Sequence, residues 1–407
     1  MFLTIITFII VLGVLVFVHE LGHFLAARKF GVKAEEFGFG FPPRMFGVYK
    51  DKQGKWKRVI GGKEVKDAPG TIYSLNWIPI GGFVKIKGED AAGDGSIVGG
   101  SRDTSEDKNS CQQELEQDSL VNKPIWQRAI IMSAGVTMNI VLAAALIIFG
   151  LSIGMPQVLD GIHPKAQISD KKIQVVQVYP DSPASQAGII IGDAIISINN
   201  VRFVNYEELQ KFVDENQGKE LDYIIGRDSD EMLIAITPEI RQETSMGGIG
   251  IAIAETGIVK YPWYLAIAEG VKTTVFLTWA IIAAFYELFK GLIAGHGLSA
   301  DIAGPVGIAA LTGQMARMGF VYVLQFAALL SINLAIINFL PFPALDGGRV
   351  LFLFLEKIKG RPVKRELEAA IHQAGLILLM LLVLVVTFKD VARFGDNFKM
   401  LWDKIAG

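Results

Sequence analysis

The first seventeen residues of the chain, Met1–Phe17, contain no charged side chain and run directly into the segment VHELGH at residues 18–23. An apolar stretch of this length is typical of a helix that crosses a membrane. In lipid every backbone amide must be hydrogen-bonded within the protein, and a helix meets that requirement by itself. Because residues four apart share one face of a helix, His19 and His23 are expected to present two imidazoles on the same side.

The two histidines enclose a glutamate, Glu20, in a spacing that many zinc hydrolases use. In that motif the imidazoles bind Zn²⁺ and the glutamate acts as a general base on a water molecule. The alternative is a pair of histidines that are only packed and hydrogen-bonded. Ionisable groups at membrane depth are costly and usually functional, which favours the metal site. His19 and His23 are therefore predicted zinc ligands, and Glu20 is the predicted catalytic residue.

The composition indicates an integral membrane protein. The chain has 407 residues, of which 51% are hydrophobic and 20% charged, and its mean hydropathy is +0.40, more apolar than a soluble protein. A net charge of -2 argues against a nucleic-acid partner, and the single Cys111 excludes an intrachain disulfide. The first apolar run lacks a basic start and a small-residue cleavage site, so we expect a retained helix rather than a signal peptide.

Four apolar runs predict about four transmembrane helices, at residues 1–27, 130–153, 321–345 and 374–388. Basic residues follow the first and the third run, and such residues favour the cytoplasmic side. Four spans place both basic clusters in the cytoplasm, whereas a fifth span at Thr273–Leu292 would move the second cluster outside. We therefore expect residues 273–292 to lie on the membrane surface.

The polar regions divide the chain into an N-terminal membrane region, an inserted α/β domain and a C-terminal membrane region, at residues 1–156, 157–245 and 246–407. Residues 71–87 are rich in β-formers and are interrupted at Pro79 and at two glycines, as a membrane-associated β-hairpin would be. Residues 88–123 are polar and rich in Gly, Asp and Ser, which predicts a flexible loop. The predicted fold class is thus a polytopic α-helical membrane protein with a hairpin and one inserted domain.

A catalytic zinc ion needs a third protein ligand, and Asp346 is the best candidate. It ends an apolar run whose prolines and following Gly347-Gly348 allow a sharp turn. Phe2 to His19 covers about 26 Å of a hydrocarbon core of about 30 Å, so the histidines should lie near the cytoplasmic end of their helix. The four-span topology brings Asp346 to the same depth. The alternative is a turn residue that only ends the helix.

Together these motifs resemble bacterial membrane-embedded site-2 proteases of the regulator of sigma-E protease type. The resemblance rests on HELGH at residues 19–23, on NFLP at 338–341 with LDG at 345–347, and on a segment similar to a PDZ domain between them. It implies that His19, His23 and Asp346 bind Zn²⁺ and that Glu20 is the general acid and base. It also implies a PDZ-like fold for the inserted domain.

The resemblance implies two sets of substrate contacts. Asn333 and Asn338 are expected to bind the substrate, because an amide can satisfy both donors and acceptors of an unwound chain. Hydrogen bonds to neighbouring helices are the alternative use of these asparagines. The segment IPIGGFVKIK at residues 78–87 resembles the membrane-reentrant hairpin of the family, so Gly82 and Phe83 are expected to hold the substrate by strand addition. A surface hairpin without a substrate role is the alternative.

The second apolar run contains Gly135 and Asn139, which resemble the second-helix pattern of the family. The family often has proline where this chain has Val136, and that departure weakens a catalytic role for the segment. Close helix packing through Gly135 is the expectation here.

Three functions are compatible with these motifs: an intramembrane zinc endopeptidase, a non-proteolytic PDZ scaffold with a structural zinc, and a zinc transporter. A transporter would need more polar residues across the spans, and a structural site does not need Glu20. We therefore expect a protease of the bacterial inner membrane that cuts single-span membrane proteins, such as anti-sigma factors or remnant signal peptides. The PDZ-like domain, expected outside the cytoplasm, either recruits chain termini or excludes untrimmed substrates.

Overall fold

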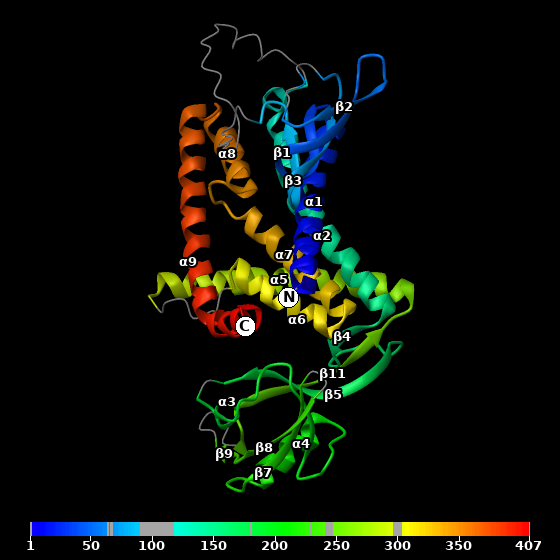
Figure 1. The fold of residues 1–407 in the computed structure, drawn as a ribbon, viewed down its shortest axis with the longest axis vertical. Coiled ribbons are helices and arrows are strands. Elements are labelled where there is room, and N and C mark those ends of the chain that lie inside the picture. Colours follow the sequence, from blue (N-terminus) through cyan, green and yellow to red (C-terminus); the bar gives the residue numbers. More distant parts are fainter. Residues whose placement is uncertain are drawn as a thin grey trace. The chain divides into compact units, whose positions relative to one another are not determined.

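Five helices in the described residues are long and apolar enough to cross a membrane, judged by length and composition. The computed structural model describes residues 2–62, 65, 68–89, 118–179, 181–227, 230–240, 247–295 and 303–406. The five are α1 (Phe2–Lys29), α2 (Ile125–Ile153), α5 (Trp263–Ile293), α7 (Phe320–Phe339) and α9 (Arg365–Ala406) (Figure 1). They comprise the four predicted membrane helices and the segment predicted to lie on the surface.

The chain forms two compact units. One comprises Met1–Ile147, Val271–Gly319 and Val323–Gly407, and the other comprises Ile148–Gly270 with Phe320–Tyr322. The first unit also contains the shorter helices η3 (Leu120–Asn122), α6 (Pro305–Met318) and α8 (Asp346–Lys359). Most of the predicted loop at residues 88–123, with Cys111, lies outside the described residues.

Small residues let the helices of the first unit approach closely. A Cβ added at Gly22 of α1 would lie 2.4 Å from the carbonyl oxygen of Ala134 on α2, and one at Gly313 of α6 would lie 2.5 Å from the Thr4 side chain on α1. Such contacts are how helices associate where lipid removes the hydrophobic driving force. Their buried core runs through α1, α2 and α7 and includes Val11, Leu15, Ala327, Leu142, Leu146, Val323, Leu330 and Leu334.

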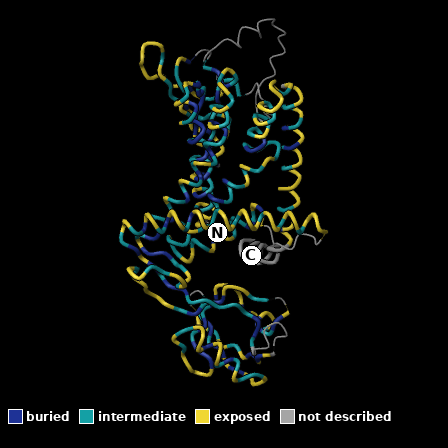
Figure 2. The backbone as a smooth tube through the Cα atoms, turned by 180° about the vertical axis from the view of Figure 1, so that it is seen from behind, coloured by how far each residue is buried: buried dark blue, intermediate teal, exposed yellow. Residues whose placement is uncertain are grey.

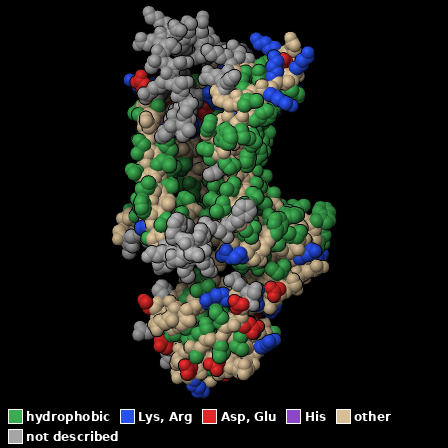
Figure 3. Space-filling view, viewed as in Figure 1, with side chains coloured by type: hydrophobic (Ala, Val, Ile, Leu, Met, Phe, Trp, Pro, Cys, Tyr) green, Lys and Arg blue, Asp and Glu red, His purple; other side chains and the backbone are tan. Residues whose placement is uncertain are grey.

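The surface of the first unit is apolar along its helices. Hydrophobic side chains cover most of the visible helical face, and Lys and Arg gather near the turn between the first two strands (Figure 3). Long stretches of α5 and α9 are exposed in the isolated chain (Figure 2). Exposed Leu, Ile, Val and Phe in such numbers need lipid around them. This surface agrees with a membrane protein.

A sheet of three strands, in the order β2-β1-β3, lies against α1. The strands are β1 (Ala34–Lys50), β2 (Trp56–Ile60) and β3 (Ile72–Ile86). Phe37 of β1 is paired with both Tyr73 and Val84, so this part of β1 lies between the two halves of β3. The segment predicted as a simple hairpin is therefore part of a larger sheet, because a strand forty residues earlier separates its halves. That long-range pairing leaves no local pattern in the sequence.

The second unit contains the inserted α/β domain, whose six strands are ordered β4-β11-β5-β6-β7-β8. These strands are β4 (Met155–Val158), β5 (Gln167–Val178), β6 (Ala194–Ile198), β7 (Leu221–Arg227), β8 (Asp230–Ile236) and β11 (Ile251–Lys260). Its helices are α3 (Pro183–Gln186) and α4 (Tyr206–Glu215), and β9 (Glu239–Ile240) pairs with β10 (Gly247–Gly248).

One core fills this domain, and Tyr223 and Ile198 at its centre are fully buried. The turn before β6 is fixed by Asp193, which is 1% exposed and accepts two hydrogen bonds from Arg227, at 2.8 and 2.7 Å. β11 follows the predicted end of the domain at residue 245, yet it pairs with both β4 and β5. The sheet thus includes residues that the sequence pattern had assigned to the C-terminal membrane region.

Candidate metal centre

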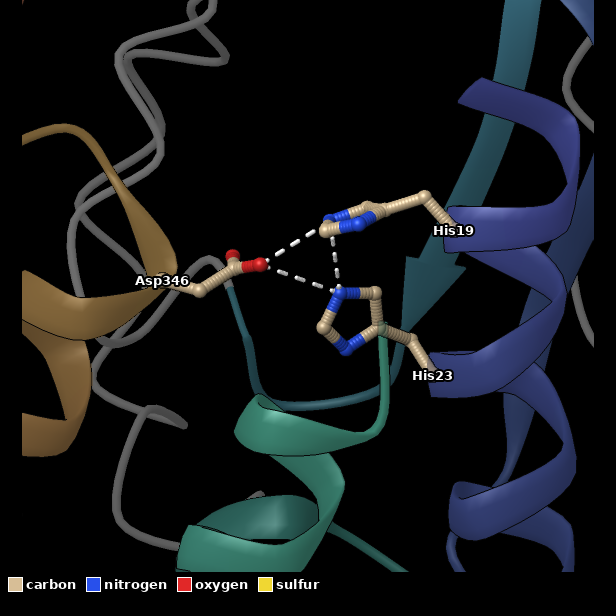
Figure 4. A group of neighbouring side chains, drawn as sticks. All are labelled: His19, His23 and Asp346. Atoms are coloured by element: carbon tan, nitrogen blue, oxygen red, sulfur yellow. Dashed lines mark hydrogen bonds and ion pairs between the residues drawn. The ribbon is translucent and has the colours of Figure 1, made fainter. Parts of the chain in front are cut away.

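Three side chains with metal-binding atoms meet in the first unit: His19, His23 and Asp346 (Figure 4). The imidazoles project from one face of α1, and Asp346 is the first residue of α8. The Asp346 Oδ2 atom lies 2.9 Å from the His19 Nε2 atom and 3.3 Å from the His23 Nε2 atom. The two Nε2 atoms are 3.3 Å apart. The structure thus joins residues that are 327 positions apart in the chain.

The hydrogen bond of the His23 Nδ1 atom indicates which nitrogen of that ring carries a hydrogen. Its Nδ1 atom lies 2.8 Å from the carbonyl oxygen of Ile131 on α2. A carbonyl oxygen can only accept, so the Nδ1 atom carries a hydrogen and donates it. A neutral imidazole with its hydrogen on Nδ1 has a bare lone pair on Nε2. In a neutral His23 ring, that lone pair faces the Asp346 carboxylate and the other imidazole.

A bare nitrogen close to a carboxylate oxygen is repelled unless a cation lies between them. Two imidazole nitrogens and one carboxylate oxygen form a donor set that suits Zn²⁺. Atoms bound tetrahedrally to zinc at about 2.0–2.2 Å lie roughly 3.3–3.6 Å from one another, close to the spacing found here. Within the described ranges no other group of three His, Cys, Asp or Glu side chains is placed to hold a metal ion. The residues therefore fit a zinc ion.

The turn that carries Asp346 is held by α9. Ala344 has a φ of +74°, a left-handed conformation that costs a non-glycine residue roughly 1–2 kcal/mol. Its N–H group donates to the Nδ1 atom of His372 on α9, at 2.9 Å. A Cβ added at Gly375 of the same helix would lie 2.4 Å from the Cβ of Pro343. Helix α9 therefore braces the segment from which Asp346 projects.

Two glycines allow α8 to begin directly against the end of α7. A Cβ added at Gly347 would lie 2.3 Å from the carbonyl oxygens of both Phe339 and Leu340, and one at Gly348 would lie 2.3 Å from that of Phe342. No side chain fits at either position without a shift of the backbone. The pair therefore fixes the start of α8, and with it the place of the metal-facing carboxylate.

Two ion pairs hold the rest of α8. Arg349, three residues after Asp346, pairs with Glu89 in the turn that follows β3. Arg128 on α2 pairs with Glu356, with 2.5 Å between the Arg128 Nη2 and Glu356 Oε1 atoms. The four side chains are between 17% and 24% exposed, so solvent screens these pairs only in part. Helix α8 is thus tied to both α2 and the sheet.

Glu20 lies on α1 beside the end of the sheet, where β3 comes closest to the helix. A Cβ added at Gly82 of β3 would lie 2.8 Å from the Cα atom of Phe17 and 3.2 Å from the Cγ atom of Glu20. A glycine is therefore required for this strand to pass so close to the Glu20 side chain. Phe83 follows on β3, partly buried and paired with Gly38 of β1.

Helix α2 packs closely against both imidazoles at Gly135. A Cβ added at Gly135 would lie 2.3 Å from the His23 Nε2 atom and 2.8 Å from the His19 Nε2 atom. One turn later, the Nδ2 atom of Asn139 lies 3.2 Å from the Nδ1 atom of His19. The close packing expected at Gly135 is present, and its partners are the two histidines.

The asparagines expected to contact substrate both lie on α7 and are partly buried. The Asn333 Nδ2 atom donates to the carbonyl oxygen of Leu329 in its own helix, at 3.0 Å. Within the described residues the Asn338 side chain has no hydrogen-bond partner, so its amide is available to another chain. Neither is hydrogen-bonded to the three metal-facing residues.

Sequence reasoning missed three contributors to the centre: Ile131, Asn139 and His372. Ile131 acts through its backbone, which no sequence motif reports. Asn139 is a polar residue in an apolar run, a signal that was present but was interpreted as packing. His372 has no motif around it in the sequence, and its partner Ala344 is 28 residues away.

Comparison with known proteins gives a match to the family described as Peptidase family M50, over residues 7–60 and 58–382. The regulator of sigma-W protease RasP of Bacillus subtilis is 33% identical, over 96% of this chain and 98% of that protein. The zinc metalloprotease RasP of Geobacillus kaustophilus is 31% identical, over the same shares of the two chains. The zinc metalloprotease RasP of Bacillus licheniformis is also 31% identical, over 96% of this chain and 99% of that protein.

One similarity to a solved structure concerns a part of the chain only. The PDZ domain of an SdrC-like protein from Listeria monocytogenes is 20% identical, covers 21% of this chain and 92% of that domain, and has a TM-score of 0.20.

Gly135→Ala tests the closeness of α2 to the imidazoles. The new methyl group would overlap the His23 and His19 rings, which must then move apart, and we expect the purified variant to lose most of its bound metal. Gly13→Ala on α1 is the matched control, because its methyl group would meet only Phe39 at 3.5 Å. Metal content is measured by atomic emission on the detergent-solubilised proteins. A Gly135→Ala protein with the metal content of the control would contradict the geometry.

Proposed function

The chain belongs to peptidase family M50 and is an intramembrane zinc metalloprotease, and on that premise we propose that His19, His23 and Asp346 hold its zinc ion and that Glu20 is its catalytic acid and base. The observation that carries the proposal is the convergence of two imidazole nitrogens and one carboxylate oxygen at 2.9–3.3 Å. Glu20 follows His19 directly on the same helix.

When bound by these residues, zinc polarises the scissile carbonyl group and makes water more acidic. The Glu20 carboxylate takes a proton from the water molecule that attacks the carbonyl carbon, and then delivers that proton to the leaving amine nitrogen. The Ile131 carbonyl keeps the hydrogen of His23 on Nδ1, so the Nε2 lone pair stays directed at the metal position. Each residue of the centre thus has one chemical task.

The end of β3 beside Glu20 is suited to hold the substrate. Residues 82–86 pair with β1 on one side only, which leaves the other edge of this strand segment without a partner strand among the described strands. A substrate helix must unwind before it is cut, and an edge strand can satisfy its freed amides by strand addition. We assign this edge, with Gly82 and Phe83, to substrate binding, and the free amide of Asn338 to the same task.

Contacts along α1 support a four-span topology. Gly313 of α6 lies against Thr4, whereas Asp346, which follows α7, lies against His19 near the other end of α1. Helix α7 therefore runs from one end of α1 to the other. Within the second unit, Gly270 of α5 lies against Ile148, on the part of α2 that is remote from the histidines. These contacts favour a surface position for α5 over a fifth crossing.

The enzyme acts on membrane proteins. We assign it to the bacterial inner membrane, with the α/β domain on the extracytoplasmic side and the centre near the cytoplasmic side. Its substrates are single-span proteins already shortened by another protease, an anti-sigma factor or remnant signal peptides. The family membership and a relative named for its regulation of sigma-W support this substrate class. The α/β domain, in the PDZ-like role expected of it, selects the shortened chains.

Glu20→Gln tests the catalytic role. The amide cannot accept the proton of water, so cleavage of a model transmembrane substrate is expected to fall by about 10²–10⁴-fold. The zinc content is expected to stay at the wild-type value, because Glu20 is not among the ligands. Glu287→Gln on α5 is the control, since that side chain is 64% exposed. Wild-type cleavage rates in Glu20→Gln would refute the assignment.

Reporter tags placed after residues 262 and 318 test the topology. Both are expected to report an extracytoplasmic position, because α5 between them does not cross. A cytoplasmic reading at 262 would contradict the external α/β domain. A cytoplasmic reading at 318 alone would show that α5 is a fifth span.

A further inference from the structure

Asn139 of α2 is fully buried behind His19, and the partners of its amide are incomplete. Its Nδ2 atom lies 3.2 Å from the Nδ1 atom of His19, and its Oδ1 atom has no hydrogen-bond partner among the described residues. A buried amide oxygen without a partner costs roughly 1–3 kcal/mol. A polar side chain is retained here inside an apolar helix, so the contact with His19 needs a chemical explanation.

The tautomer that His19 needs for zinc binding explains this contact. Its Nε2 atom is the one that faces Asp346 and His23, so in the proposed zinc site this atom must be bare. The hydrogen of a neutral ring then sits on Nδ1, which must donate to an acceptor. The Asn139 amide is the group that faces Nδ1. Its nitrogen cannot accept a hydrogen bond, whereas its oxygen can.

The oxygen and nitrogen of an asparagine amide exchange places when the amide group turns over, and they are assigned by the hydrogen bonds around them. The orientation shown leaves the Oδ1 atom of Asn139 unpaired, so the bond to His19 decides between the two orientations. We propose that Asn139 is a positioning residue that turns its Oδ1 atom to the Nδ1–H group of His19 and so holds the Nε2 atom ready for zinc. This inference rests on the proposed zinc site.

Contacts with α7 and with the two imidazoles fix the backbone of α2 around Asn139. The Ser331 hydroxyl of α7 donates to the Asn139 backbone carbonyl at 2.8 Å, and Ser331 is itself fully buried. Gly135, one turn earlier, touches both rings and prevents any closer approach of α2. Helix α2 thus provides one acceptor for each histidine: the Ile131 carbonyl for His23 and the Asn139 amide for His19. Such outer partners fix the orientation of a metal ligand.

The test compares Asn139→Leu with Asn139→Asp in the full chain, purified in detergent. Leucine matches the size of asparagine but accepts no hydrogen bond, whereas aspartate accepts one. Zinc retention is measured against a graded series of chelator concentrations, with Zn²⁺ as the only added metal. Asn139→Leu is expected to weaken zinc binding by about 10–100-fold, and Asn139→Asp to keep it at or above the wild-type level.

Thr137→Val is the matched control on the same helix, because Thr137 is exposed and bonds only to Ser133 of α2. Should Asn139→Leu fail to fold, Asn139→Ala removes the same acceptor without added bulk and carries the same expectation. Wild-type zinc affinity in Asn139→Leu would overturn the role of Asn139. Equal losses in Asn139→Leu and Asn139→Asp would do the same, since the acceptor that aspartate keeps would then make no difference.

His19→Ala separates this inference from the proposal beneath it. If His19→Ala loses zinc while Asn139→Leu retains it, only the role of Asn139 is overturned. If His19→Ala and the wild type retain zinc equally, the zinc site itself is overturned.

Discussion

The structure of the first unit depends on one arrangement: two imidazole nitrogens and a carboxylate oxygen that meet within 2.9–3.3 Å inside packed, apolar helices. The His23 Nδ1–H group donates a hydrogen bond to the Ile131 carbonyl, and the Nε2 atom of the same ring lies 3.3 Å from the Asp346 carboxylate. A cation between these atoms turns a repulsive contact into an attractive one. Helix α2 packs against the imidazoles, and α9 holds the turn that carries Asp346. In the proposed site, zinc would contribute to the stability of this region as well as to its chemistry.

The same arrangement accounts for the path of the chain through the membrane. Thr4 lies at the start of α1, and His19 lies farther along the same helix. Helix α7 connects α6, which packs against Thr4, to Asp346, which lies against His19. One crossing by α7 is enough to bring Asp346 to the histidines. A helix that is long and apolar enough to span, such as α5, need not do so when its neighbours in the chain lie on one side. Apolar length alone does not decide whether α5 crosses the membrane.

The convergence of His19, His23 and Asp346 could be predicted from the sequence because their signals are local. Two histidines four apart, and an aspartate flanked by prolines and glycines at the end of an apolar run, can be recognised without a structure. The partners of those ligands could not be predicted, because Asn139 and His372 act across helices and Ile131 acts through its backbone. The prediction of both sheets was incomplete for the same reason. Strand β1 lies between the halves of β3, and β11 joins the six-stranded sheet although it follows the predicted end of that domain. Contacts between distant segments depend on packing, which no short pattern records.

The central claim, that Asp346 completes a zinc site begun by His19 and His23, is tested most directly by the zinc content of Asp346→Ala. The full-length wild type and the variant are purified in detergent, dialysed against the same weak chelator and analysed by atomic emission. The account predicts one zinc ion per wild-type chain and almost none in the variant, because two imidazoles alone hold zinc weakly. Equal zinc in both proteins would contradict it.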